Sequence, residues 1–140
     1  MNKIKFIIES DLEQVALVGM SINAICTHIP VSNKIAYQIE LCAVEAVNNS
    51  IIHAYGGLPC NSVEISFSYD SDSITLEVTD TGKSMDRAAL DRAQLYTPSN
   101  SDSDSLSENG RGLAIIKEVM DSIAYVGTEG RNCFTMTKLL

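Results

Sequence analysis

The sequence predicts a two-layer α/β sandwich, in which a mixed, mainly antiparallel sheet carries its helices on one face. Short runs of alternating apolar and polar residues indicate strands, whereas longer segments repeat apolar residues at helical spacing. The predicted order is β-α-α-β-β, then a polar stretch, then α-β-β, which favours one sheet covered by helices. With 140 residues, 45% of them hydrophobic, the chain has enough apolar material for one core and a single domain, residues 1–140.

The N-terminal part predicts one strand and two helices. Lys3–Ile8 is short and rich in β-forming residues, which is typical of a strand. Ser10 stands three residues before a glutamate, so we expect Ser10 to cap a first helix, which ends before Pro30. Ser32 is expected to cap a second helix, which the pair Gly56-Gly57 ends.

The remainder predicts a hairpin, a lid and a second α-β-β segment. The alternating runs 63–69 and 74–78 are separated by a short Asp/Ser turn, as in an antiparallel hairpin. The Ser/Asp-rich stretch 98–109 has no apolar period, and we interpret it as part of a functional lid at about 94–112. The last predicted elements are a helix over Leu113–Met120 and strands near Ser122–Gly127 and Cys133–Leu139.

The composition excludes several classes of protein. Ten basic against 18 acidic residues give a net charge of −8, so we expect no direct nucleic-acid partner. No apolar run reaches the roughly 18 residues that cross a bilayer, and the N-terminus lacks a signal-peptide core, so no membrane association is expected. The four cysteines are widely spaced without a C-x-x-C pair, which is typical of reduced thiols in a cytoplasmic protein.

Three polar groups in the sequence could carry chemistry, and the first lies on the second helix. Glu45, Asn49 and His53 recur every four residues, so they form one stripe along the helix. A carboxylate and a carboxamide one turn apart suit a hard cation with its water shell, and the carboxylate can also take a proton. Spacing alone favours an ordinary polar rim, with a solvated Glu45 and His53 capping the helix end.

The other two groups follow a strand and precede a helix. Asp80-Thr81-Gly82 ends the second hairpin strand, where a buried carboxylate could accept a hydrogen bond from an exocyclic amino group such as that of adenine. The same residues also fit a tight turn. In Gly110-Arg111-Gly112-Leu113 the glycines allow close approach of a phosphate, and the helix N-terminus supplies free amides. A simple hinge is the alternative.

Taken together and in this order, the three groups resemble the E-x-x-x-N, D-x-G and lid-end glycine boxes of the GHKL, or Bergerat-fold, ATPases. The likeness covers essentially the whole chain. The single small domain is similar to the anti-sigma factor serine/threonine protein kinases of this superfamily. Features that look like this branch are Glu45-Ala46-Val47, Ile52-His53-Ala54-Tyr55 and Ser84-Met85-Asp86.

The resemblance implies a role for each site residue. Asn49 would coordinate the Mg²⁺ that bridges the ATP phosphates, and Glu45 would be the general base toward a serine hydroxyl. Asp80 would hold the adenine amino group, with Gly82 allowing the base to approach. The other residues implied to bind the nucleotide are His53, Gly110, Arg111, Gly112 and Leu113.

The resemblance also implies partners. It implies phosphorylation of a serine on a STAS-type anti-anti-sigma protein, sequestration of a sigma factor, and a homodimer formed through the first strand and helix. Two other functions stay open: a non-catalytic GHKL-fold regulator that only binds a partner, and an ATPase domain acting as a histidine kinase in trans. Intact Glu45 and Asn49 favour the serine kinase over the non-catalytic regulator.

The sequence departs from the superfamily pattern at two places. Many members have a second glycine two positions after the D-x-G glycine, where this chain has Ser84. A Gly-Thr pair commonly touches the adenine site near the last strand, where this chain has Arg131-Asn132-Cys133. The departure at Arg131-Asn132-Cys133 concerns the implied contacts to the adenine base.

Overall fold

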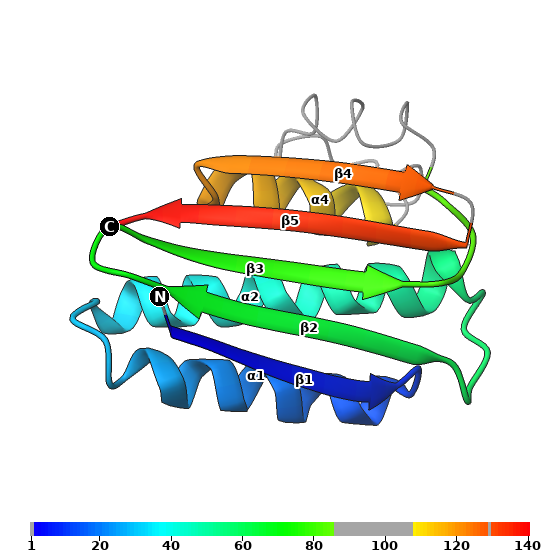
Figure 1. The fold of residues 1–140 in the computed structure, drawn as a ribbon, viewed down its shortest axis with the longest axis horizontal. Helices are drawn as coiled ribbons and strands as arrows, with labels where there is room; N and C mark the ends of the chain where they lie inside the picture. Colours follow the sequence, from blue (N-terminus) through cyan, green and yellow to red (C-terminus); the bar gives the residue numbers. More distant parts are fainter. Residues whose placement is uncertain (1, 86–107, 129) are drawn as a thin grey trace.

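The computed structural model describes residues 2–85, 108–128 and 130–140, and it shows one sheet with its helices on one face (Figure 1). Most of the predicted lid, residues 94–107, lies outside the described residues. The strands are β1 (Asn2–Glu9), β2 (Ser62–Tyr69), β3 (Ser73–Asp80), β4 (Ser122–Thr128) and β5 (Arg131–Leu139). The helices are α1 (Leu12–Cys26), α2 (Asn33–Asn49), the π-helix η1 (Ser50–Ala54) and α4 (Glu108–Val119).

The strand order is β1-β2-β3-β5-β4, and every registered pair is antiparallel. The predicted two-layer sandwich is confirmed. The sequence favoured a mixed, mainly antiparallel sheet, and the described strands contain antiparallel pairs without a parallel one. Inward side chains align across the strands, with Leu76 of β3 opposite both Phe67 and Met136. All three are fully buried beneath the helices, which fixes the register because a one-residue slip would expose them.

The predicted cap of the first helix is wrong by one residue. Asp11 is the N-cap of α1, and its carboxylate accepts a hydrogen bond from the Glu13 amide at 2.9 Å. The Ser10 hydroxyl instead donates to the Leu58 carbonyl at 2.6 Å and accepts from the Asn61 amide at 3.1 Å. Ser10 therefore ties the start of α1 to the loop before β2, a long-range contact that outweighs the local capping pattern.

The second helix changes its form at the predicted stripe. Ser32 caps α2 as expected, accepting from the Ile35 amide at 3.1 Å. After Asn49 the chain continues as the π-helix η1, which ends before Gly56 and Gly57, both with positive φ. The wider π turn separates Asn49 from His53, so the stripe does not continue with regular α-helical spacing.

Helix α4 begins earlier than predicted. Helix α4 starts at Glu108 rather than at Leu113, so Gly110, Arg111 and Gly112 belong to its first turns and do not precede it. Glycine has low helix propensity, and for this reason the sequence pattern favoured a loop there.

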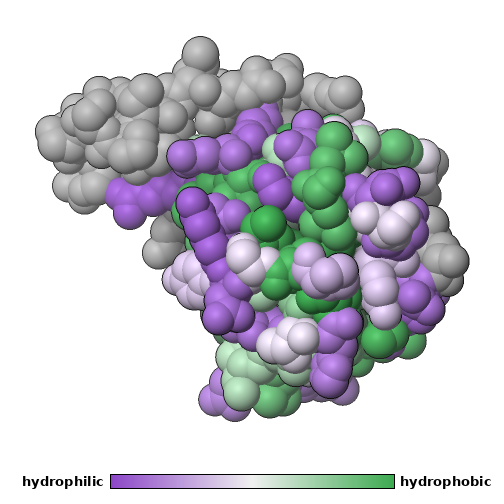
Figure 2. Space-filling view, turned by 90° about the vertical axis from the view of Figure 1, so that its left-hand side faces the viewer, coloured by the Kyte–Doolittle hydropathy of each residue, from purple (hydrophilic) through white to green (hydrophobic). Residues whose placement is uncertain are grey.

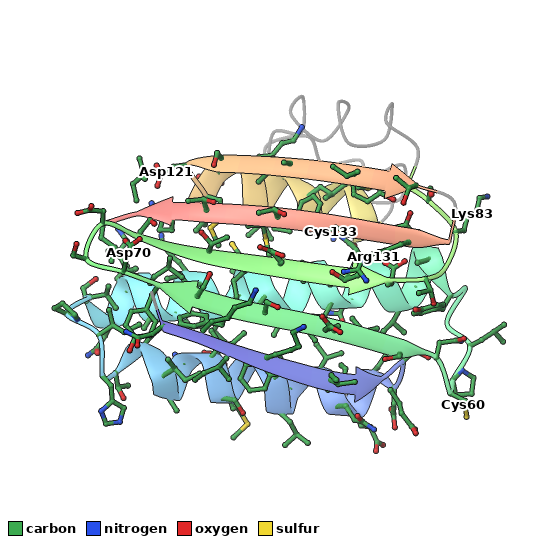
Figure 3. The ribbon with its side chains drawn as sticks, viewed as in Figure 1. Cys60, Asp70, Lys83, Asp121, Arg131 and Cys133 are labelled. Carbon is green, nitrogen blue, oxygen red and sulfur yellow. The ribbon has the colours of Figure 1, made fainter. Side chains whose placement is uncertain are left out.

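The two ends of the sheet differ. Both termini lie at the end that carries the β2–β3 turn (Figure 1). Seen from that side, hydrophobic and hydrophilic residues are interspersed over the surface (Figure 2). At the opposite end of the sheet β3 ends at Asp80, and the chain continues to Lys83. Figure 3 shows Lys83 at this end, whereas Asp70 and Asp121 lie at the end of the termini. None of the described helices is long and apolar enough to cross a bilayer.

Candidate functional site

A cavity of about 320 Å³ lies between the helix layer and the strand ends, and it brings together residues from most of the chain. It contains Asn49 and His53 of the predicted helical stripe, Asp80 of the strand-end group and Leu113 of α4. The remaining lining residues are Ala46, Ser50, Ala54, Val78, Lys83, Ser84, Met85, Tyr125, Asn132 and Phe134. A largely apolar hollow with a few convergent polar groups is typical of a small-molecule site.

Asp80 is a buried carboxylate held by three donors. Its Oδ1 accepts from Asn132 Nδ2 at 2.8 Å and from the Gly82 amide at 3.1 Å, and its Oδ2 accepts from Ser50 Oγ at 2.9 Å. Only 6% of Asp80 is exposed. A carboxylate offers about four acceptor positions, so Oδ2 keeps capacity for one more donor. Asp80 can therefore accept a hydrogen bond from a ligand in the cavity.

Gly82 follows Asp80 at a very close approach to η1. A Cβ atom built on Gly82 would overlap the Ala54 carbonyl oxygen and lie 2.6 Å from the carbonyl carbon. The same carbonyl accepts from the Lys83 amide at 2.8 Å. Tyr55 supports the turn from the same side, because its hydroxyl accepts from the Thr81 amide at 2.8 Å. The D-x-G turn is thus fitted against η1, and only glycine allows this distance.

Asn49 carries an unsatisfied polar group beside the cavity. Its Nδ2 atom is buried, and within the described part of the chain it has no hydrogen-bond partner. A carboxamide turned by 180° presents its oxygen in place of its nitrogen, so this end can serve a phosphate oxygen or a cation. Mg²⁺ is commonly held by one or two protein ligands together with substrate phosphates and water. Asn49 fits that requirement.

His53 lines the cavity from η1 as an uncharged side chain. Burial lowers the pKa of His53 below its ordinary value of 6.5, because desolvation disfavours the imidazolium. At neutral pH the imidazole therefore offers one donor and one acceptor and no positive charge. Among the lining residues that the structure describes, Lys83 supplies the positive charge.

Glu45 does not line the cavity but lies beside it, on α2 with its carboxylate against α4. A Cβ atom on Gly112 would stand 2.6 Å from Glu45 Oε2. The carboxylate therefore lies directly against the first turns of α4. This negative charge also helps to raise the pKa of the neighbouring Cys42 thiol to about 12, after the larger effect of burial.

The lid-end group is only partly placed at the cavity. Leu113 is buried and lines it, whereas Arg111 and Gly112 stand next to it on α4 outside the lining. The backbone of Gly110 lies in the first turn of the same helix. Residues 110–113 therefore lie at the edge of the cavity, where they form the first turns of α4.

Several residues of the site have no local sequence signal. Ser50 occupies a helical position that reads as part of the apolar stripe, yet its hydroxyl bonds to Asp80. In the sequence Asn132 stands only as part of a departure from the superfamily pattern, yet it donates to both Asp80 and the Gly82 carbonyl. The signal for both is long-range packing: Asn132 stands opposite Asp80 in the β3–β5 register.

Known proteins resemble this chain over nearly its full length. A family model described as histidine kinase-like ATPase domain matches residues 8–138. Serine-protein kinase RsbW of Bacillus velezensis is 28% identical over 144 residues, covering 100% of this chain and 87% of the relative. Anti-sigma F factor of Oceanobacillus iheyensis is 29% identical over 143 residues, covering 99% and 93%.

Solved structures agree on the fold. The RsbU and RsbW domains of Rv1364c from Mycobacterium tuberculosis match with a TM-score of 0.69 at 13% identity, covering 99% of this chain and 33% of that chain. The SiaB-SiaC complex from Pseudomonas aeruginosa matches with a TM-score of 0.63 at 12% identity, covering 98% and 89%. The predicted fold and the predicted resemblance are confirmed, and the relatives' names bear out the class of serine/threonine protein kinase.

Proposed function

The chain belongs to the histidine kinase-like ATPase domain family. We propose that it uses Mg-ATP to phosphorylate a serine of an anti-anti-sigma protein, and that it sequesters a sigma factor. The observation that carries the proposal is the meeting of Asn49 and Asp80 at one cavity. A carboxamide whose nitrogen has no partner among the described residues suits the phosphate end of ATP, and a fixed carboxylate with spare acceptor capacity suits the amino end.

Each described residue has a place in this scheme. Asp80 accepts from the adenine amino group, and the cavity encloses the base beside Gly82. Asn49 would hold Mg²⁺, and the bound metal would neutralise charge on the phosphates. His53 and Leu113 line the site, and Arg111 with the backbone of Gly110 and Gly112 meets the triphosphate end at the start of α4.

Glu45 serves as the general base for the transfer. The serine oxygen of the partner forms a bond to the γ-phosphorus, and the bond from that phosphorus to the β–γ bridging oxygen breaks. The hydroxyl proton passes to the Glu45 carboxylate, and ADP leaves with the bonding electron pair. Glu45 suits this role because it stands one helical turn from Asn49 and beside the start of α4.

The relatives support the choice of partners, since their names include anti-sigma F factor and serine-protein kinase. A kinase with a sigma factor and an anti-anti-sigma protein as partners would act in the cytoplasm. We also propose a homodimer through β1 and α1. β1 is an edge strand, and large apolar side chains are exposed on both elements: Ile4, Ile7, Leu12, Leu17 and Met20.

Calorimetry with ATP, with and without a magnesium chelator, tests the site. Wild-type protein should bind ATP with a metal-dependent gain that Asn49→Ala abolishes. Asn48→Ala is the matched control, because Asn48 is the neighbouring residue on α2 and does not line the cavity. Equal ATP affinity in Asn49→Ala and wild type would refute the assignment of Asn49.

Labelled ATP and candidate partners separate the remaining functions. Label on a partner serine supports the kinase, label on a partner histidine favours the histidine kinase in trans, and binding without transfer favours the silent regulator. Sedimentation of wild type against Met20→Glu tests the dimer. A wild-type protein that sediments only at the monomer mass at micromolar concentration would refute it.

A further inference from the structure

The two positions at which the sequence departs from the superfamily pattern contact each other. Ser84 Oγ donates to Asn132 Oδ1 at 2.7 Å, although the residues are 48 positions apart. Asn132 is only 1% exposed, so its carboxamide depends on protein partners. The two departures therefore form one structural unit, which we call the Ser84–Asn132 pair.

Both donor hydrogens of the Asn132 carboxamide are used by the protein. Its Nδ2 donates to Asp80 Oδ1 at 2.8 Å and to the Gly82 carbonyl at 2.9 Å, and a carboxamide nitrogen has two hydrogens to give. Its oxygen accepts from Ser84. Asn132 lines the cavity, but both of its donor hydrogens are taken, so it acts on the polar atoms of a ligand through Asp80.

Neighbouring contacts fix the pair in place. On either side of Ser84 the backbone is held, because the Lys83 amide donates to the Ala54 carbonyl at 2.8 Å and the Met85 amide donates to the Tyr125 hydroxyl at 2.6 Å. Figure 3 shows Lys83 at this end of the sheet, beyond β3.

Strand β4 lies beside the same pair. Gly127 stands opposite Asn132 in the β4–β5 register. A Cβ atom at Gly127 would lie 3.1 Å from Ser84 Oγ and 3.2 Å from Asn132 Oδ1. Gly127 therefore leaves room for the pair on this side, while Ser84 itself stays exposed.

We propose that Ser84 and Asn132 are positioning residues that hold the Asp80 carboxylate in one orientation and so make the site select a 6-amino purine over a 6-oxo purine. The proposal rests on the proposed ATP binding. With Oδ1 occupied by Asn132 and Gly82, the spare acceptor capacity lies on Oδ2. An adenine amino group donates to it, whereas a 6-oxo group brings an oxygen against an oxygen and leaves both without a donor.

The test compares ATP with its 6-oxo analogue ITP by calorimetry on wild type, Ser84→Ala, Asn132→Ala and the double variant. Asn132→Ala should lower the preference for ATP by about tenfold, the factor expected when one hydrogen bond to a charged group is lost. Ser84→Ala should lower it less. The double variant should match Asn132→Ala, because Ser84 acts through Asn132.

A purely structural role would weaken ATP and ITP equally, so the ratio of affinities is the decisive quantity. Cys133→Ala is the control, since the next side chain on β5 points to the opposite face of the sheet and should leave the ratio unchanged. A wild-type preference retained in folded Asn132→Ala overturns the inference. If that variant does not fold, an unchanged preference in Ser84→Ala overturns it. Wild-type protein that binds neither nucleotide refutes the proposed function itself, and the inference with it.

Discussion

Gly112 leaves room for the Glu45 carboxylate, because a Cβ atom at position 112 would lie 2.6 Å from Glu45 Oε2. The proposed base and the start of α4 are therefore in direct contact. The contacting atom is the end of a flexible side chain, so Glu45 can shift without a movement of the backbone. A residue larger than glycine would shift the base without disrupting the core.

Gly112→Ala should separate stability from activity. Alanine has a higher helix propensity than glycine by about 1 kcal/mol, which offsets the displacement of Glu45, so urea unfolding should change by no more than about 1 kcal/mol. Phosphoryl transfer should fall at least about tenfold, because the base is misplaced. Glu118→Ala, on the exposed side of the same helix, is the control. Unchanged transfer in Gly112→Ala would show that the contact has no part in the reaction.

Gly82→Ala should behave in the opposite way. Its new methyl group would meet the Ala54 backbone carbonyl, which cannot move without disturbing η1 and the Lys83 amide that donates to it. We expect a loss of about 1–3 kcal/mol in the free energy of unfolding, as for other overpacked sites, together with weaker ATP binding. Urea unfolding beside Gly112→Ala measures the contrast, and equal stability of the two variants would contradict it.

The buried thiols predict a loss of stability at alkaline pH. Burial raises the pKa of Cys42 from 9.0 to about 12, and that of Cys26 to about 11. Above pH 9.0 the unfolded chain releases these protons before the folded chain does. The contribution of Cys42 is therefore fully present below pH 9.0 and is lost as the pH rises toward about 12.

Urea unfolding across that pH range measures the effect. Cys42→Ala should have a shallower fall in stability than wild type above pH 9.0. Cys60→Ala, which removes an exposed thiol, is the comparison variant. The same slope in Cys42→Ala and wild type would show that Cys42 does not contribute to it.

Local patterns were sufficient to predict the layers and most of the elements. The alternation in β2 and β3 gave the hairpin, and Ser32 gave the start of α2, because both features are set by residues close in sequence. The cap at Asp11 and the early start of α4 were missed. In the first case a contact of Ser10 with the loop before β2 overrides the local pattern, and in the second two glycines lie inside a helix.

The candidate site was predictable in part. Asn49, His53, Asp80 and Leu113 do meet at one cavity, and the order of the motifs was enough to suggest it. The groups that fix Asp80 were not predictable, since Asn132 reaches it only through the pairing of β3 with β5. The π-helix after Asn49 also has no periodic signal, because it inserts a wider turn into an otherwise regular helix.

The most direct test of the kinase assignment is Glu45→Gln, measured for ATP affinity and for phosphate transfer to a cognate partner serine. The substitution keeps the shape of the side chain and removes its ability to take the proton. ATP affinity should stay at the wild-type value, while transfer should fall by about 10²–10⁴-fold, the usual contribution of a general base. Transfer at the wild-type rate in Glu45→Gln would contradict the assignment of Glu45 as the base.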